Sequence, residues 1–284
     1  MLLLSPGLAL FLYGVSSIPG EGGILHAKVL VPGLIGLALM VSFVFYSFKP
    51  KHPLLDLRLF KNRNLSVSLI TMFVFAAAFF GGLLLVPQFL QQVQGESPLS
   101  AGWLLAPQGI GAMVTMPIAG ALTDRYPVGR IVPVGLVLII IGMFSLTQLD
   151  VDTSHWGYLI PVLFVMGLGM GATMMPIMTS ALKTLKHHDV ARGSTLLNIN
   201  QQISSSVGVA IFSVVLTNAL LGNIPATPAE APQAAAEAFS HTFWVAAWLV
   251  TLTLIPASFL PRKREESRLL EDADDVPTPS VPLH

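Results

Sequence analysis

Long apolar stretches alternate with short polar connections along most of the chain. Eight of these stretches have no Lys, Arg, Asp or Glu in their middles, and a helix needs ~20 mostly apolar residues to cross a bilayer. Prolines recur inside them, which a membrane bundle tolerates because neighbouring helices or water satisfy the freed carbonyl groups. The pattern predicts an all-α, polytopic membrane helix bundle of about eight transmembrane helices. The expected spans lie near residues 1–18, 29–48, 65–90, 101–122, 131–149, 156–182, 193–220 and 241–260.

Basic residues fall on alternate connections between these stretches. Of the 15 basic residues, 14 lie around residues 49–63, 125–130, 183–192 and 262–268, and Lys28 alone lies on the other side. Cytoplasmic connections of membrane proteins carry the excess of Lys and Arg. We therefore expect a multi-pass protein of the cell (plasma) membrane with both termini cytoplasmic. One misplaced span would break the alternation, so the pattern supports the count of eight.

The first apolar stretch begins at Met1 and has two interpretations. A cleaved signal peptide would need a basic segment ahead of the apolar residues and a small-residue cleavage site, and both are missing. We therefore expect a transmembrane helix whose upstream part is absent.

Composition narrows the possible function classes. Only 11% of the 284 residues are charged, against about 25% in ordinary soluble domains, and 53% are hydrophobic. The net charge of zero excludes the basic excess that nucleic-acid binding requires. This zero is the sum of two opposed sides, because the expected outer connections carry mostly acids and the cytoplasmic side mostly bases. The absence of cysteine excludes a disulfide scaffold.

Sequence patterns of catalysis or cofactor binding are absent from the chain. It contains no HExxH, GxSxG, P-loop or CxxC motif, so we expect no enzyme activity, no cofactor and no metal. No acidic residue lies in the middle of an apolar stretch, so we expect no proton relay within this chain.

Two connections have distinctive local patterns. His187 and His188 lie next to each other in the connection 183–192, and adjacent residues on a helix do not share one face. We therefore expect a solvated loop there rather than a metal site. The segment 222–240 contains three prolines and an alanine run, and we expect an outer loop with room for a short interfacial helix.

The charged connection at residues 120–130 is the most informative local pattern. Glycine allows a tight backbone there, and Asp124 is placed to cap the following helix or to pair with a basic side chain. An ordinary charged turn is the alternative. The segment resembles G-x-L-x-D-R-x-G-R-(R/K), the motif that joins the second and third helices of each half of the major facilitator superfamily, with two extra residues. The resemblance implies a cytoplasmic gate motif formed by Gly120, Asp124, Arg125, Gly129 and Arg130.

Further segments extend the resemblance over nearly the whole chain. Residues 52–63, 86–109, 167–176 and 196–202 are similar to the linker and helices of the fourteen-span EmrB/QacA-type drug:proton antiporters. The resemblance implies spans seven to fourteen of that architecture. It divides the chain into two linker transmembrane helices (1–48), a cytoplasmic linker (49–64), a C-terminal six-helix transporter bundle (65–261) and a charged, proline-containing tail (262–284) that we expect to be disordered in the cytoplasm.

A stripe of uncharged polar residues interrupts the apolar stretch 193–220. Asn198, Gln202 and Ser205 follow the spacing i, i+4 and i+7 and therefore share one face of a helix, and Asn200 widens the stripe. Two explanations stay open, namely hydrogen bonds between helices, worth about 0.6–2 kcal/mol each, or the wall of a substrate cavity. The candidate cavity residues are Gln108, Asn198, Gln201, Gln202 and Ser205.

Small, aromatic and thioether residues crowd several of the stretches. Gly167, Gly169 and Gly171 are expected to allow close approach of helices rather than to bind a ligand. Phenylalanines at 73–80 and methionines at 113–116 and 170–178 suit promiscuous apolar binding. We expect most of them to pack or to face lipid, and a minority to line a cavity.

Two functions of different classes follow from these features. The resemblance implies the C-terminal part of a secondary transporter that exports amphipathic small molecules against proton entry, with the gate motif latching the cytoplasmic side. Its expected partners are the lipid bilayer and a missing N-terminal half-transporter, which would supply the proton-coupling charges; no nucleic acid is expected. Without that half we expect no transport. The alternative is a non-transporting membrane fragment or an interaction partner of a complete transporter.

Overall fold

The computed structural model describes residues 63–260 except 184, 186, 224–226 and 228–229, and a few helical residues between 7 and 39. It gives the backbone alone at residues 187–189. Nearly all of the expected span 1–18 lies outside the described residues, as do nearly all of the linker 49–64 and the whole tail 262–284. Within the expected span 29–48, residues 30–36, 38 and 39 are described and are helical. The comparison with the sequence predictions therefore concerns the six-helix bundle.

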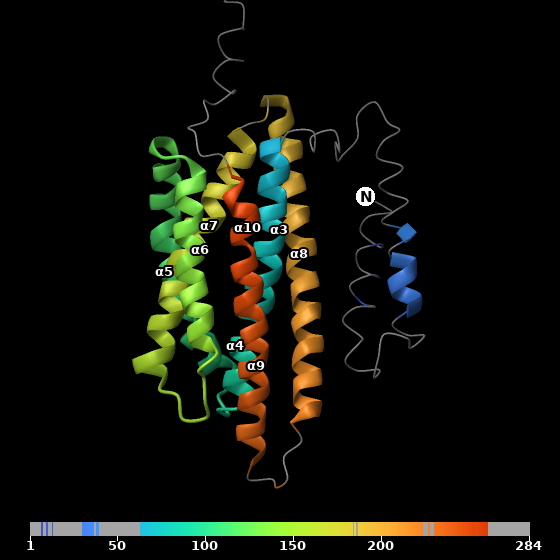
Figure 1. Ribbon diagram of the computed structural model, residues 1–284, viewed down its shortest axis with the longest axis vertical. Helices are drawn as coiled ribbons and strands as arrows, with labels where there is room; N and C mark the ends of the chain where they lie inside the picture. Colours follow the sequence, from blue (N-terminus) through green and yellow to red (C-terminus); the bar gives the residue numbers. More distant parts are fainter. Residues whose placement is uncertain are drawn as a thin grey trace, which may run out of the picture.

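Six long helical segments make up the described bundle (Figure 1), and each is long and apolar enough to cross a membrane. They correspond to the six expected spans between residues 65 and 260. The elements are α3 (Arg63–Leu83), α4 (Leu85–Gln92), α5 (Pro98–Arg125), α6 (Val128–Leu146), the π-helical turn η2 (His155–Leu159), α7 (Ile160–Lys183), α8 (His187–Gly222), α9 (Ala231–Leu252) and α10 (Leu254–Ser258).

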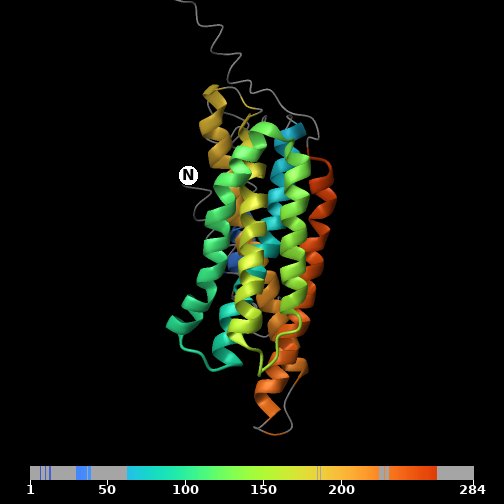
Figure 2. The ribbon, with the colours of Figure 1, turned by 90° about the vertical axis from the view of Figure 1, so that its left-hand side faces the viewer.

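The helices form two groups of three. In one group α7 packs against both α5 and α6, and in the other α3 packs against α8 and α9. Contacts of α6 with α9 and of α3 with α7 join the groups. Figure 1 shows α5 and α8 on opposite flanks, with α6 and α9 in front of α7 and α3. Figure 2, turned by 90°, shows α9 on the side away from α8's upper half.

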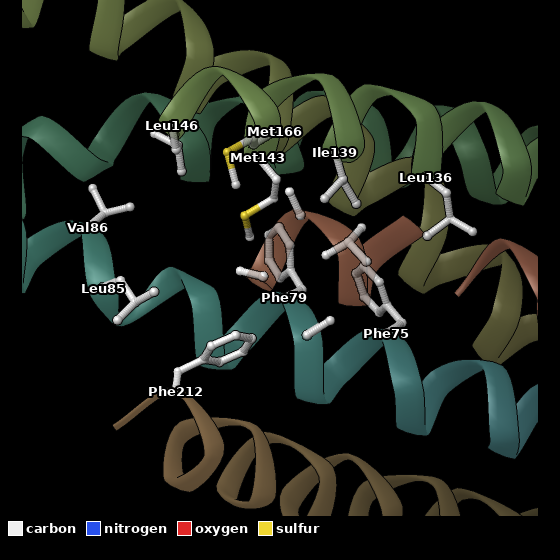
Figure 3. Close-up of a cluster of buried hydrophobic side chains, with 14 of the residues drawn as sticks. Phe75, Phe79, Leu85, Val86, Leu136, Ile139, Met143, Leu146, Met166 and Phe212 are labelled. Carbon is white, nitrogen blue, oxygen red and sulfur yellow. The ribbon is translucent and has the colours of Figure 1, made fainter. Parts of the chain in front are cut away.

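The centre of the bundle is filled by aromatic and aliphatic side chains (Figure 3). Phe75 and Phe79 of α3 stack with ring centroids 5.3 Å apart and point toward Ile139 and Met143 of α6. Phe212 of α8 approaches from the other side of α3. The rings of Phe75 and Phe79 are fully buried. These two phenylalanines therefore pack inside the bundle, as we expected for most residues of this group, and do not line a cavity for a ligand.

Glycines set the closest helix contacts. A Cβ atom on Gly167 of α7 would overlap the backbone of Gln108 in α5, and one on Gly208 of α8 would overlap the carbonyl of Ala77 in α3. On Gly171 it would lie 2.9 Å from the carbonyl oxygen of Ala112, and on Gly169 2.6 Å from that of Gly135. Small residues let membrane helices approach until their backbones touch. The expectation for Gly167, Gly169 and Gly171 is confirmed.

Two prolines divide helices that the sequence presents as continuous. Proline lacks the N–H that would bond the carbonyl four residues earlier, and its ring crowds that carbonyl. Four residues before Pro87 lies Leu83, where α3 ends, and four residues before Pro256 lies Leu252, where α9 ends. The helix restarts as α4 and α10 respectively, so each span keeps its course.

The sequence made two connections too long. In both cases the following helix begins several residues before the apolar stretch from which it was predicted. Helix α8 starts at His187, so His187 and His188 stand in its first turn rather than in a solvated loop. Helix α9 starts at Ala231, with Pro232 in its first turn and the alanine run continuing it. The expected outer loop 222–240 is therefore too long, because residues 231–240 belong to α9.

The two ends of the bundle carry opposite charge. We call them the basic end and the acidic end. Every described Lys and Arg lies at the basic end. Every described acidic side chain except Asp124 lies at the acidic end. This separation arises because successive helices run in opposite directions (Figure 1). The basic end holds Arg63, Arg125, Arg130, Lys183 and Arg192, and the acidic end holds Glu96, Asp150, Asp152, Glu230 and Glu237.

Candidate functional site

The predicted gate motif, residues 120–130, forms two helix ends joined by a short turn rather than a loop of eleven residues. Helix α5 continues through Arg125 and α6 begins at Val128, which leaves Tyr126 and Pro127 as the connection. Tyr126 is extended (φ −122°, ψ 147°), as expected for a residue that precedes proline. Gly120 stands inside α5, so the turn does not use its backbone freedom; the turn depends on Pro127.

Asp124 pairs with a residue that the sequence pattern did not assign to the motif. Its Oδ1 lies 2.7 Å from Nζ of Lys183, which stands in the last turn of α7. Of the two roles open to Asp124, the ion pair is therefore present. The Asp124 side chain is 70% exposed, so such a pair contributes only about 0.2–1 kcal/mol to stability. It links the end of α5 to the end of α7.

The remaining motif residues present charge at the basic end. Arg125 and Arg130 are exposed, and Gly129 is half-buried in the first turn of α6. Arg125 stands in the last turn of α5, where a cation is stabilised by the negative end of the helix dipole. The motif thus combines one interhelical ion pair with two exposed guanidinium groups.

The polar stripe on α8 divides into two faces. Asn200 donates its amide N–H to the backbone oxygen of Leu69 in α3 at 3.1 Å, and Ser204, one turn later, is fully buried. Asn198 and Gln202 are exposed on the other side of the helix. The hydrogen-bond explanation therefore holds for Asn200. It does not hold for Asn198 or Gln202 among the described residues.

Gln201 and Ser205 lie between these two faces, and both are half-buried. The Ser205 hydroxyl donates to the backbone oxygen of Gln202 at 3.1 Å within α8. Helix α8 has 36 residues and is therefore about 54 Å long. Counted from His187, the segment from Asn198 to Ser205 lies about 17–27 Å along the helix, which places the stripe away from both ends.

Gln108 stands on a different helix and faces different neighbours. It is 5% exposed in α5, beside the close contact with Gly167 of α7, and its Nε2 has no hydrogen-bond partner within the described residues. A buried donor without a partner is costly. Because α5 and α8 occupy opposite flanks (Figure 1), the described bundle does not bring Gln108 into contact with the α8 stripe.

The two flanking helices are the least buried spans of the bundle. On α5 the exposed side chains are apolar, with Trp103 73% and Met113 69% exposed. On α8 the exposed face includes the amides of Asn198 and Gln202. An amide that faces hydrocarbon leaves its polar atoms unsatisfied, at a cost of several kcal/mol. The exposed face of α8 is therefore suited to water or to another polar surface.

Comparison with known proteins agrees with this architecture. The sequence model of the Major Facilitator Superfamily matches residues 2–209. The fold is similar to the crystal structure of a bacterial homologue of the human lysosomal transporter Spinster, in an inward-facing and unoccupied conformation. That likeness covers 86% of this chain and 59% of the other with a TM-score of 0.60 and 14% identity, and it concerns the fold alone.

Several curated relatives are drug-resistance or drug-export proteins by name, and they are longer than this chain. The multidrug resistance protein B homologue of Mycobacterium tuberculosis H37Rv is 40% identical over 94% of this chain, which spans 56% of that protein. The multidrug export protein EmrB of Escherichia coli K12 is 25% identical over 75% of this chain and 43% of its own length. The chain thus spans about half the length of the relatives it matches.

Proposed function

The chain belongs to the major facilitator superfamily, and from this premise we propose that it is the C-terminal portion of a proton-driven exporter of amphipathic small molecules. The superfamily consists of transporters and not of enzymes. The coverage of about half of each relative supports a partial transporter. The names of the relatives support multidrug substrates, and the two groups of three helices suit one half of a transporter of this superfamily.

The exposed polar face of α8 carries the proposal. Asn198 and Gln202 point away from their own bundle, although α8 is apolar enough to span a membrane. Intramembrane polar side chains face a bundle interior or a water-filled cavity. A second bundle, related to this one across the α8 face, would provide that cavity and would enclose the substrate site near the membrane midplane.

The charge of the two ends supports a sidedness for the proposed transporter. The excess of Lys and Arg at the basic end supports a cytoplasmic position for that end, with the acidic end outside. Both termini would then be cytoplasmic in the plasma membrane. No described acidic side chain lies within the membrane-spanning middle of the bundle, so the coupling proton would be carried by the other half.

Thiol accessibility tests the cavity directly, because the chain contains no cysteine. We would join the chain to the part of the Mycobacterium tuberculosis relative that lies outside the match and introduce Gln202→Cys. A water-soluble methanethiosulfonate should modify this variant, and a lipophilic cationic dye should slow the reaction. The matched variant Ile141→Cys lies on the exposed apolar side of α6 and should stay unmodified, because its thiol faces lipid.

An unreactive thiol at position 202 would contradict the proposed water-filled cavity. If the Gln202→Cys variant is as unreactive as Ile141→Cys, the α8 face contacts lipid or dry protein rather than a wet site. Equal reactivity with and without dye would leave a water-filled cavity that does not bind this substrate class.

A further inference from the structure

Two connections meet at the acidic end and are tied by one side chain. Gly95, in the connection between α4 and α5, has φ +69°, a conformation that favours glycine. It follows Gln94, whose Nε2 lies 3.5, 3.3 and 3.2 Å from the backbone oxygens of Asp150, Val151 and Thr153 in the connection between α6 and η2. Gln94 thereby joins the α3–α4 segment to the α6–α7 hairpin.

The contacts of Gln94 define the proton position on His155. Carbonyl oxygens only accept hydrogen bonds, so the amide nitrogen of Gln94 must face them and its Oε1 must face His155. Nε2 of His155 lies 2.8 Å from that Oε1. Since Oε1 is an acceptor, Nε2 must carry a hydrogen. The neutral ring therefore has its proton on Nε2 and a lone pair on Nδ1.

The second nitrogen of His155 faces a carboxylate. Nδ1 lies 3.8 Å from Oε1 of Glu96, and both side chains are 27% exposed. In the neutral state two acceptors face each other across this gap, which is unfavourable. A second proton can bind only at Nδ1, and there it converts the contact into an ion pair with Glu96.

We propose that Gln94, Glu96 and His155 form a proton-sensitive clasp that ties the α4–α5 connection to the α6–α7 connection when the surrounding solution is acidic. Histidine is the side chain whose charge changes between about pH 5 and pH 8. Adding the proton creates the contact with Glu96 while the bond to Gln94 stays, so the clasp tightens as the pH falls and loosens as it rises.

Other ionisable groups at the acidic end leave this contact undisturbed. Among the described residues, Glu96 alone has an oxygen within ion-pairing distance of the His155 ring. Asp150 accepts a hydrogen bond from the N–H of Val151 at 2.7 Å, and Tyr158 of η2 donates to the oxygen of Ser145 at 2.8 Å. The remaining groups are Asp152 on the same connection, Glu230 before α9, and Glu237 and His241 on α9.

The clasp adds to other contacts between the helices that follow these connections. Helices α5 and α7, which follow the two connections, already touch backbone to backbone at Gly111 and Gly167. Ser240 of α9 also donates to the oxygen of Thr147, at the start of the α6–α7 connection. If the acidic end faces the outside, as the proposed sidedness requires, external acid closes this end; the pH response itself does not depend on the sidedness.

Hydrogen–deuterium exchange of the purified 284-residue chain in nanodiscs tests the clasp without any transport assay. Each variant is compared with the wild type at the same pH, and each is read in the segment whose sequence it leaves unchanged. Glu96→Gln is read at residues 150–154, and His155→Gln is read at residues 93–97. Intrinsic exchange chemistry then cancels, and transport activity has no influence on the result.

The expected result is a difference confined to acid. At about pH 5.5, residues 150–154 should exchange about two- to five-fold faster in Glu96→Gln than in the wild type, as expected for loss of a partly exposed ion pair. At about pH 8 this acceleration should disappear, because the substituted amide can donate a hydrogen bond to an unprotonated Nδ1, where the carboxylate offers only a second acceptor. The acceleration at residues 93–97 in His155→Gln should likewise be larger in acid.

Two further variants make the outcome decisive. Gln94→Ala should accelerate exchange at residues 150–154 at both pH values, because it removes the bonds to the backbone. Glu237→Gln, an exposed acid at the same end, should change nothing at either pH. Equal exchange of Glu96→Gln and the wild type in acid, or an identical difference at both pH values, would overturn the clasp.

Discussion

Single glycines determine how closely the helices of this bundle approach. The sequence predicted close contacts for Gly167 and its neighbours because small residues at helical spacing let backbones touch. The sequence could not predict which residues these glycines contact. Gly167 meets the backbone of Gln108 on another helix, and a backbone contact leaves no signal in the identity of the side chain. The same limit applies to Asp124 and Lys183, which are 59 residues apart, and to Gln94 and His155, which are 61 apart. Only the folded bundle joins them.

Replacement of Gly208 by alanine should destabilise the chain. The new Cβ would overlap the backbone of Ala77, and a backbone cannot move aside as a flexible side chain can. We expect Gly208→Ala to lower the free energy of unfolding by about 1–3 kcal/mol, the usual cost of overpacking. The measurement is unfolding in mixed micelles titrated with sodium dodecyl sulfate, followed by tryptophan fluorescence.

Gly102→Ala is the matched control for that measurement. A Cβ on Gly102 of α5 would meet nothing within 4 Å, and alanine favours a helix over glycine by up to about 1 kcal/mol. This variant should be as stable as the wild type or more stable. Equal losses in both variants would show that the α3–α8 contact is not limited by Gly208.

Helix α8 shows what a hydrophobic pattern reveals about an element and what it misses. The apolar stretch placed the span correctly, and the i, i+4, i+7 spacing correctly put Asn198 and Gln202 on one face. The start of the helix was missed, because its first turns are polar and lie beyond the apolar stretch. The different role of Asn200 was also missed, since spacing cannot tell which side of a helix meets a neighbour.

Substitution of Asn198 and Asn200 should separate the packed face of α8 from its exposed face. Asn200→Leu removes the hydrogen bond to Leu69, and we expect it to lower the free energy of unfolding by about 0.6–2 kcal/mol. Asn198→Leu alters an exposed position and should leave the unfolding of this chain unchanged. The same detergent titration measures both variants. A larger loss for Asn198→Leu would mean that the exposed face of α8 is already covered in the isolated chain.

The number and direction of the helices in the described bundle can be predicted from the sequence more directly than the contacts between them. Alternating basic connections required the helices to run up and down, and the described charges do segregate to two ends. The grouping of α5 with α7 and of α3 with α8 was not predictable, because it depends on which glycines and polar side chains meet in space. The starts of α4 and α10 depend on Pro87 and Pro256, and the apolar pattern alone does not show where these prolines interrupt a helix.

Proton-driven dye efflux most directly separates a half-transporter from a fragment without transport function. Membrane vesicles would contain either this chain alone or the chain joined to the remaining part of the Mycobacterium tuberculosis relative, at equal expression. We expect a proton gradient to drive export of a lipophilic cationic dye by the joined protein and no export by the chain alone. Export by the chain alone would contradict the proposal that it is one half of a transporter. No export by a joined protein that is folded would favour the non-transporting alternative.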